Sequence, residues 1–264
     1  MQIQLTVQQP AQATEFSLGS QFIPTAPIGK LQLKLMTEFS LHQALKDHYA
    51  RPPQDRQEVY VDGFQIDVVR GDMLVEVQTG NFTHLKSKLA GLLPNHPLLL
   101  VHPIPLDKWI VRLNGTGNEA ISRRKSPRHG RVEDIFVELV RIAPFLGHPN
   151  LHLEVVITRE EEILQNDGHG SWRRKGWSIV DRNLLEIVQT VPLYGIQDFC
   201  RFISLEYTPS FTSQELAKAL QVPDYLGYKI VYCLRALHLL EPAGKRGRAR
   251  LFRPAERCDK LGNS

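Results

Sequence analysis

Three short apolar segments joined by two tight turns constrain the fold of this chain more than any other feature of its sequence. The segments EVYV, FQIDVVR and MLVEVQT are separated by Asp62-Gly63 and by Gly71-Asp72. Asp-Gly between two apolar runs is a strong signal for a β-hairpin, and such short connections join antiparallel strands. We therefore expect residues 58–79 to form a three-stranded antiparallel meander.

Helical periodicity appears on both sides of this meander. The segment TEFSLHQALKDHYA (37–50) predicts a helix with Thr37 as its N-cap, and NFTHLKSKLAGLL (81–93) predicts a second helix that ends before Pro94. The segments PLLLVHPI and KWIVRL then predict two more strands. This order of elements indicates an α/β fold in which a mixed sheet is flanked by helices.

The middle of the chain predicts a β-rich extension of that core. Residues 114–130 are rich in Gly and Asn, so we expect a flexible excursion there. Residues 131–146 have the pattern of one amphipathic helix, and HLEVVITREEEI and WSIVDRNLLEIVQTVPLY read as two long strands. We expect TREEEI (158–163) to be a solvated edge of its strand.

Polar residues interrupt the apolar strands of the meander. Glu76 and Gln78 stand two residues apart, so both side chains leave the same face of the third strand. Asp67 lies in the neighbouring strand, close enough for both carboxylates to reach one site. A buried acid is costly unless it is paired or binds a cation.

A third acid, Glu38, falls on the apolar side of the first predicted helix, at about 100° per residue, and so points toward the sheet. Carboxylate oxygens that converge from several elements suit Mg²⁺ or Mn²⁺. A metal held in this way can activate water for attack on phosphorus.

The order of these elements resembles the PD-(D/E)XK nuclease superfamily, which has the restriction-endonuclease-like fold. The order is a helix with Glu38, a strand with Asp67, a strand with Glu76-Val-Gln78, and then a helix. The resemblance covers about residues 36–113 and rests on a short motif. It implies that Asp67 and Glu76 bind metal and that Glu38 supports the metal or orients water. Gln78 then occupies the position that Lys usually holds.

Gln78 cannot supply the positive charge of that Lys, because an amide only donates and accepts hydrogen bonds. Some members of the superfamily carry the Lys in the following helix, where this chain has Lys86 and Lys88. At 100° per residue, Lys86 lies at the edge of the buried face and Lys88 about a quarter-turn away. We therefore expect Lys86 to complete the site.

A simpler interpretation is that Glu76 and Gln78 lie on the solvent-exposed side of their strand. Other polar residues near the site have ordinary explanations. Asp62 and Asp72 are turn residues. We expect a surface position for Glu58, solvation for His84, and structural roles for His96 and His102.

The charge distribution favours a polyanionic partner, since the pI is about 9.0 although the net charge is only +4. Residues 122–131 contain five Lys or Arg and no acid, and WRRKG (172–176) adds a basic turn between Trp172 and Trp177. Such clusters supply most non-specific affinity for nucleic acid, although a solvated basic loop is an equal alternative. In the first segment the candidate DNA-binding residues are Arg123, Arg124, Lys125, Arg128 and Arg131.

The last seventy residues predict a winged helix-turn-helix. Thr212-Ser-Gln-Glu215 is a capping box that opens a short helix, a longer helix follows QVPD, and a basic hairpin comes next. The second helix of such a motif usually enters the major groove of DNA, although winged helices also bind proteins. The candidate DNA-binding residues are Tyr228, Lys229, Tyr232, Arg235, Lys245, Arg246, Arg248 and Arg250.

Cysteine usage and hydropathy bear on the compartment. Cys200, Cys233 and Cys258 are far apart, which indicates neither a zinc module nor a disulfide framework. The N-terminus lacks the pattern of a signal peptide, and no apolar run approaches the roughly 20 residues of a membrane span. We expect a cytoplasmic protein that makes no contact with membranes.

These observations lead to an expected organisation: an N-terminal arm (1–35), a nuclease-like core with a β-rich extension (36–195), a winged helix (196–255) and a tail (256–264). The leading hypothesis is a prokaryotic-type, Mg²⁺- or Mn²⁺-dependent nuclease that hydrolyses DNA phosphodiester bonds. The alternative is a catalytically silent, nuclease-fold DNA-binding regulator or assembly factor, and a third reading is an RNA nuclease. Cleavage of both DNA strands would favour a homodimer.

Overall fold

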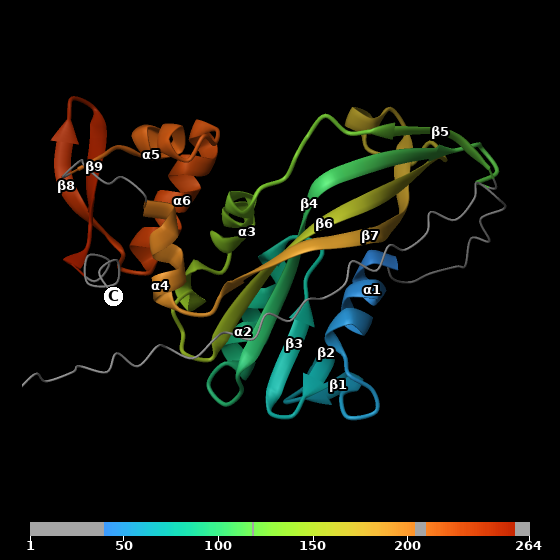
Figure 1. Cartoon of the computed structure of the whole chain (residues 1–264), viewed down its shortest axis with the longest axis horizontal. Helices are drawn as coiled ribbons and strands as arrows, with labels where there is room; N and C mark the ends of the chain where they lie inside the picture. Colours follow the sequence, from blue (N-terminus) through green and yellow to red (C-terminus); the bar gives the residue numbers. More distant parts are fainter. Residues whose placement is uncertain (1–39, 118, 204–209, 257–264) are drawn as a thin grey trace, which may run out of the picture.

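The computed structural model describes residues 40–117, 119–203 and 210–256 (Figure 1). The chain has a mixed α/β fold in which helices flank one large mixed sheet, as the sequence predicted. The strands of that sheet follow the order β1-β2-β3-β4-β6-β7, and β5 pairs with β4.

The first half of the described chain contains the predicted meander. It comprises α1 (Ser40–Tyr49), β1 (Arg56–Val61), β2 (Phe64–Arg70), β3 (Met73–Val77), the 3-10 turn η1 (Phe82–His84), α2 (Leu85–Leu92) and β4 (Leu98–Leu113). Strands β1, β2 and β3 are antiparallel neighbours, whereas β3 and β4 are parallel and are connected through α2. Asp62 and Gly63 have positive φ angles of 47° and 82°, which is why an Asp-Gly pair forms the first turn.

The second half departs from the sequence prediction in two places. It contains β5 (Ala120–Lys125), the 3-10 turn η2 (Val132–Ile135), α3 (Phe136–Leu139), η3 (Ala143–Phe145), β6 (Leu151–Asn166), η4 (Trp172–Arg174) and β7 (Trp177–Leu193). Residues 114–130 are not a flexible excursion, since six of them form β5 on the edge of β4. The helix expected over 131–146 is broken into two 3-10 turns around one short α-helix.

The prediction for TREEEI is wrong, because β6 lies between β4 and β7 rather than at an edge. Glu160 and Glu162 are only 3% and 7% exposed. Their charges are tolerated because the neighbouring strands supply cations: Lys108 Nζ lies 2.9 Å from Glu162 Oε2, and Arg182 Nε lies 3.8 Å from the same oxygen. Burial raises the pKa of Glu160.

The two faces of the sheet carry separate apolar clusters. On one face Leu41 and Leu45 of α1 pack with Val75 of β3, and on the other face Leu89 of α2 packs with Leu74 of β3. Successive residues of β3 therefore alternate between the two helices, as a strand buried on both sides requires. This sandwich holds the carboxyl end of β3 rigidly between α1 and α2.

The C-terminal part has its own small sheet. It consists of α4 (Ile196–Phe199), η5 (Cys200–Ile203), α5 (Ser213–Ala219), α6 (Asp224–Ala236), β8 (Leu240–Arg246) and β9 (Ala249–Pro254). The predicted capping box is present at the start of α5. The side-chain oxygens of Thr212 and Glu215 each accept a hydrogen bond from the backbone N–H of the other residue. The apolar side of α6 joins the cluster on the α2 face of the large sheet, so that α6 lies between the β8–β9 hairpin and α3 (Figure 1).

Two further expectations can be compared with the described residues. Cys233 is a buried core residue with a free thiol, but Cys200 is disulfide-bonded, which the sequence analysis did not indicate. Among residues 40–117, 119–203 and 210–256, none of the helices has the length and apolar character needed to cross a membrane.

Candidate functional site

Two of the predicted acids, Asp67 and Glu76, lie close together near the carboxyl end of β3. The β2–β3 ladder ends at the pair Val68 and Val75, and Asp67 and Glu76 are the residues next to this pair on each strand. Burial raises the pKa of Glu76, and the negative charge of Asp67 raises it further. The structure thus brings together the pair of side chains that the sequence assigned to the metal.

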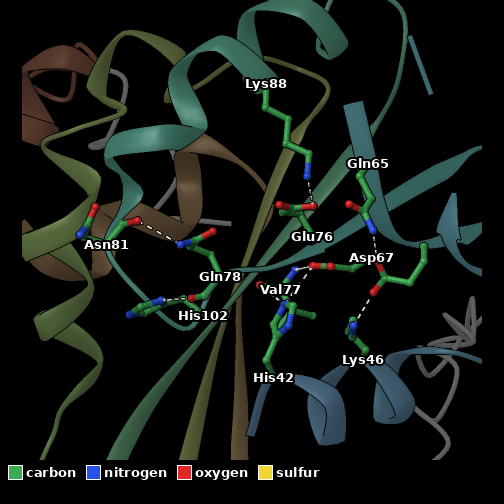
Figure 2. Close-up of polar contacts among 11 residues, drawn as sticks. His42, Lys46, Gln65, Asp67, Glu76, Val77, Gln78, Asn81, Lys88 and His102 are labelled. Carbon is green, nitrogen blue, oxygen red and sulfur yellow. Dashed lines mark hydrogen bonds and ion pairs between the residues drawn. The ribbon is translucent and has the colours of Figure 1, made fainter. Parts of the chain in front are cut away.

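Glu76 is only 8% exposed and has one charged partner, Lys88 of α2. Lys88 Nζ donates to Glu76 Oε2 over 2.5 Å, and Figure 2 shows this side chain reaching from the helix to the carboxylate. The pKa of Glu76 is raised to about 7, first by burial and then by Asp67, while the Lys88 ammonium opposes both effects. Near neutral pH this carboxyl group therefore lies on the boundary between its neutral and charged forms.

Asp67 is held by the backbone of β3 and by a histidine. Its Oδ2 atom accepts a hydrogen bond from the Val77 N–H at 2.7 Å and lies 3.3 Å from His42 Nε2. His42 Nε2 also lies 2.7 Å from the Val77 carbonyl oxygen, so α1, β2 and β3 meet at this point (Figure 2). Sequence reasoning missed His42; the signal was its place one residue after Leu41, in a helical segment that faces the meander.

Gln78 does not join the carboxylate pair through its side chain. Its Nε2 atom donates to the Asn81 carbonyl oxygen at 3.0 Å, and Figure 2 shows the amide directed at Asn81. The backbone carbonyl of Gln78 lies 2.5 Å from Nδ1 of His102, a half-buried ring whose pKa is lowered by desolvation. Gln78 and His102 therefore fix the chain where it leaves β3, and the structural role expected of His102 is confirmed.

The structure places Lys88, rather than the predicted Lys86, beside the carboxylates. Lys86 is exposed, whereas the side chain of Lys88 is half-buried and reaches Glu76. The prediction failed because it counted Phe82 as part of one regular helix. Residues 82–84 form a 3-10 turn with about three residues per turn, so the buried face of α2 is rotated toward Lys88.

Glu38, the third predicted acid, lies outside the described residues. The helix that follows it starts at Ser40, whose N–H and Oγ–H both donate to the Asp181 carboxylate of β7, at 2.8 and 2.7 Å. Within residues 40–117, 119–203 and 210–256, His, Cys, Asp and Glu side chains do not assemble in threes around a potential metal position. The described part of the site therefore offers two carboxylates, Asp67 and Glu76.

A buried cation, Lys46 of α1, was missed by the sequence analysis. Its ammonium pairs with the Glu58 carboxylate, which also accepts a hydrogen bond from Gln65 (Figure 2). Glu58 itself is partly exposed, close to the surface position expected for it. His96 also pairs with Asp62 of the first turn, at 2.9 Å, and His84 is exposed as predicted.

The basic segment 122–131 is largely neutralised by the protein itself. Arg123 Nε lies 2.6 Å from Glu161 Oε1, Lys125 Nζ lies 2.8 Å from Asp107 Oδ1, and Arg128 Nη2 lies 3.6 Å from Asp134 Oδ1. These contacts reduce the positive charge that the segment can offer to a polyanion.

Arg131, the last residue of that segment, has a structural role. Its guanidinium donates to the carbonyl oxygens of Leu220 and Gln221 over 2.9 Å each, so it links η2 to the end of α5. Arg124 is exposed on β5. The basic turn between β6 and β7 presents the exposed ring of Trp172 with the Arg173 guanidinium 5.5 Å from its centroid.

The predicted DNA-binding side chains of the C-terminal part are mostly exposed. Tyr228, Tyr232 and Arg235 lie on the outer side of α6, and Lys229 is half-buried. On the hairpin, Lys245, Arg246, Arg248 and Arg250 are exposed, and Arg246 pairs with Glu215 over 2.5 Å. Between α6 and the hairpin lies a groove of about 360 Å³.

A family model described as a domain of unknown function, DUF8091, matches residues 39–194. The chain belongs to the DUF8091 family. It is 35% identical over 220 residues to an uncharacterized protein of Treponema pallidum (strain Nichols), with 82% of this chain and 85% of that protein covered. No solved structure matches the chain significantly. The DUF8091 match takes in α1 to β7, and thus Asp67, Glu76 and Lys88, and leaves out α5, α6 and the β8–β9 hairpin.

Proposed function

We propose that this DUF8091 protein is a metal-dependent nuclease that hydrolyses DNA phosphodiester bonds. The observation that carries the proposal is the group of Asp67, Glu76 and Lys88 at the carboxyl end of β3. Two interacting carboxylates with an ammonium 2.5 Å from one of them provide the acid, acid and Lys that the PD-(D/E)XK resemblance requires. In this chain Lys88 of α2 would supply the positive charge that the superfamily's Lys usually supplies at the position of Gln78.

The connections between the elements support the same proposal. A helix, an antiparallel meander, a second helix and a strand parallel to the last strand of the meander follow one another from α1 to β4. This is the element order on which the resemblance to the superfamily was based. The carboxylates lie on the second and third strands of this unit, where that resemblance implies metal ligands.

The residues present fit a hard divalent cation. Mg²⁺ is commonly held by one or two carboxylates, and it keeps several waters or takes substrate phosphate oxygens for its other positions. Asp67 and Glu76 would be its protein ligands, and a bound cation would favour the charged form of Glu76, whose pKa is raised by burial and by Asp67. A bound cation supplies an activated water and neutralises charge on the departing oxygen.

Each side chain of the group then has a separate task. The Val77 N–H and His42 orient Asp67. Lys88 neutralises Glu76 in the metal-free protein and provides an ammonium for the substrate phosphate, which the Gln78 amide cannot replace. In this proposal DNA is held by the C-terminal α5, α6 and hairpin acting as a winged helix, the protein works in the cytoplasm, and cutting both strands would involve a homodimer.

The test is cleavage of supercoiled plasmid by the full chain in Mg²⁺, Mn²⁺ or EDTA. We expect nicking in either metal and none in EDTA, and loss of nicking in Asp67→Asn, Glu76→Gln and Lys88→Met. The matched control is Asp72→Asn, since Asp72 is an exposed acid in the turn before β3. Nicking that survives in both carboxylate variants would contradict the assignment of the site.

The alternative, a catalytically silent DNA-binding regulator, is favoured by one observation: the side chain of Gln78 is directed at Asn81 and not at the carboxylates. A regulator would shift DNA equally well in Mg²⁺ and EDTA, and no nucleic acid would be cut. A structured RNA substrate is included in the same assay. Cleavage of RNA with duplex DNA left intact would replace the DNA nuclease with an RNA nuclease.

A further inference from the structure

We propose that the groove between α6 and the β8–β9 hairpin binds an unpaired strand of nucleic acid and stacks its bases on Tyr228 and Tyr232. This inference deepens the DNA-binding part of the proposed function, because it names the form of the substrate that this module holds. It does not depend on the carboxylate site.

The tyrosines form a continuous stripe along α6. At about 100° per residue, Tyr225, Tyr228, Tyr232 and Arg235 fall within a sector of about 80°. The side chains of Leu226, Ile230, Cys233, Leu234 and Leu237 are buried on the opposite side. Tyr228 and Tyr232 are each 55% exposed, although tyrosine rings normally bury most of their apolar area. A row of exposed rings on one side of a helix is typical of a binding surface.

The groove beside this stripe combines aromatic and cationic side chains. It is lined by Tyr228 and Tyr232, by Arg235 of α6 and by Arg248 and Arg250 of β9 and its turn, and among the residues that the structure describes its lining contains no Asp or Glu. Arginine guanidinium groups at the edge of a hollow surface attract phosphate, while the rings offer flat apolar faces. The charge of the groove is therefore complementary to a polyanion that also carries planar groups.

The hairpin holds one of these cations in place. The Arg235 guanidinium lies 5.8 Å from the centroid of the Phe252 ring, which is itself buried under the groove. Phe252 is fixed because its backbone pairs with Phe211 in both directions, at 2.8 Å. The floor of the groove is thus built from α6 and from β9 together, rather than from a flexible surface loop.

The residue types favour an unpaired strand over a duplex. A helix that reads base edges in the major groove does so with hydrogen-bonding side chains such as Arg, Lys, Asn and Gln. The stripe on α6 presents phenol rings instead, and rings stack on base faces, which are accessible only when bases are unpaired. This site would therefore show little sequence preference and a strong preference for single strands or unpaired ends.

The first experiment measures fluorescence anisotropy of a labelled 12-nucleotide oligo-dT with the full chain in EDTA, so that no cleavage interferes. Stacking is worth about 1–3 kcal/mol per base, so Tyr228→Ala and Tyr232→Ala should each weaken binding about 5- to 150-fold. Tyr228→Phe and Tyr232→Phe keep the ring and should bind within about twofold of wild type. Tyr60→Ala, at a 72% exposed tyrosine on β1, is the matched control and should bind as wild type does.

Three further binding measurements decide which kind of molecule the groove binds. A blunt duplex of equal length should bind more weakly than oligo-dT, and oligo-U shows whether RNA is accepted as well. Duplex bound more tightly than oligo-dT, or oligo-dT binding unchanged in both alanine variants, would overturn the proposal. An acidic peptide that displaces the strand equally from wild type and alanine variants would also overturn it, because charge alone would then explain binding. Strand binding is measured in EDTA and does not require the carboxylate site, so it can be observed even if the protein cuts no DNA. Failure of one proposal can therefore be told apart from failure of the other.

Discussion

The raised pKa of Glu76 predicts that the metal-free protein becomes less stable as pH rises toward neutrality. An unfolded Glu releases its proton near its ordinary pKa of 4.5, whereas the folded protein keeps that proton up to a pKa of about 7. A group with a raised folded pKa stabilises the fold fully below its unfolded pKa, and this contribution is lost as pH rises through the folded pKa. The loss therefore falls between about pH 4.5 and pH 7.

The magnitude follows from the size of the shift. The difference between 7 and 4.5 is 2.5 pKa units, and each unit corresponds to about 1.4 kcal/mol. The Glu76 carboxyl group is nearly enclosed, so solvent screening reduces this value little. We expect a contribution of about 3 kcal/mol to the difference in unfolding free energy between pH 4.5 and pH 8.

The assay is urea unfolding in EDTA at pH 4.5 and pH 8 for wild type and Glu76→Gln. Gln cannot ionise, so the fall in unfolding free energy between the two pH values should be about 3 kcal/mol smaller in the variant. Glu160, whose pKa is also raised by burial, contributes equally to both proteins and cancels in the comparison. Asp72→Asn is the matched control and should behave as wild type does. The same pH dependence in wild type and Glu76→Gln would refute the reasoning.

Three other predictions concern local contacts. Lys88→Met should abolish metal-dependent nicking of plasmid without weakening DNA binding, whereas Lys86→Met, on the exposed side of α2, should change neither. Thr212→Ala removes the cap of α5 and should cost about 1 kcal/mol, read from the midpoint of urea unfolding at constant m-value. Arg131→Ala removes two hydrogen bonds to the Leu220 and Gln221 carbonyls just after α5 and should speed amide hydrogen exchange at the end of that helix, while Arg124→Ala should leave it unchanged.

The sequence predicted best those features that are set by neighbours along the chain. The meander follows from Asp62-Gly63 and the alternation around it, and the start of α5 follows from the reciprocal bonds of Thr212 and Glu215. The nearness of Asp67 to Glu76 was predictable for the same reason, because a short turn sets Val68 opposite Val75, the residues next to them.

Features that depend on distant parts of the chain were missed. The burial of Glu160 depends on Lys108 and Arg182, which come from β4 and β7 and are far away in the sequence. His42 meets Asp67 only because α1 packs across β2 and β3. Lys88, rather than Lys86, reaches Glu76 because a 3-10 turn precedes α2, and no local sequence pattern predicted that turn.

Binding of Mn²⁺ at pH 8, measured by isothermal titration calorimetry, tests directly whether Asp67 and Glu76 hold a divalent cation. At this pH Glu76 is ionised, so its proton does not compete with the metal. Wild type and Asp72→Asn should bind Mn²⁺ alike, and Asp67→Asn and Glu76→Gln should each bind at least about tenfold more weakly. Equal affinity in all four proteins would contradict the assignment of Asp67 and Glu76 as metal ligands.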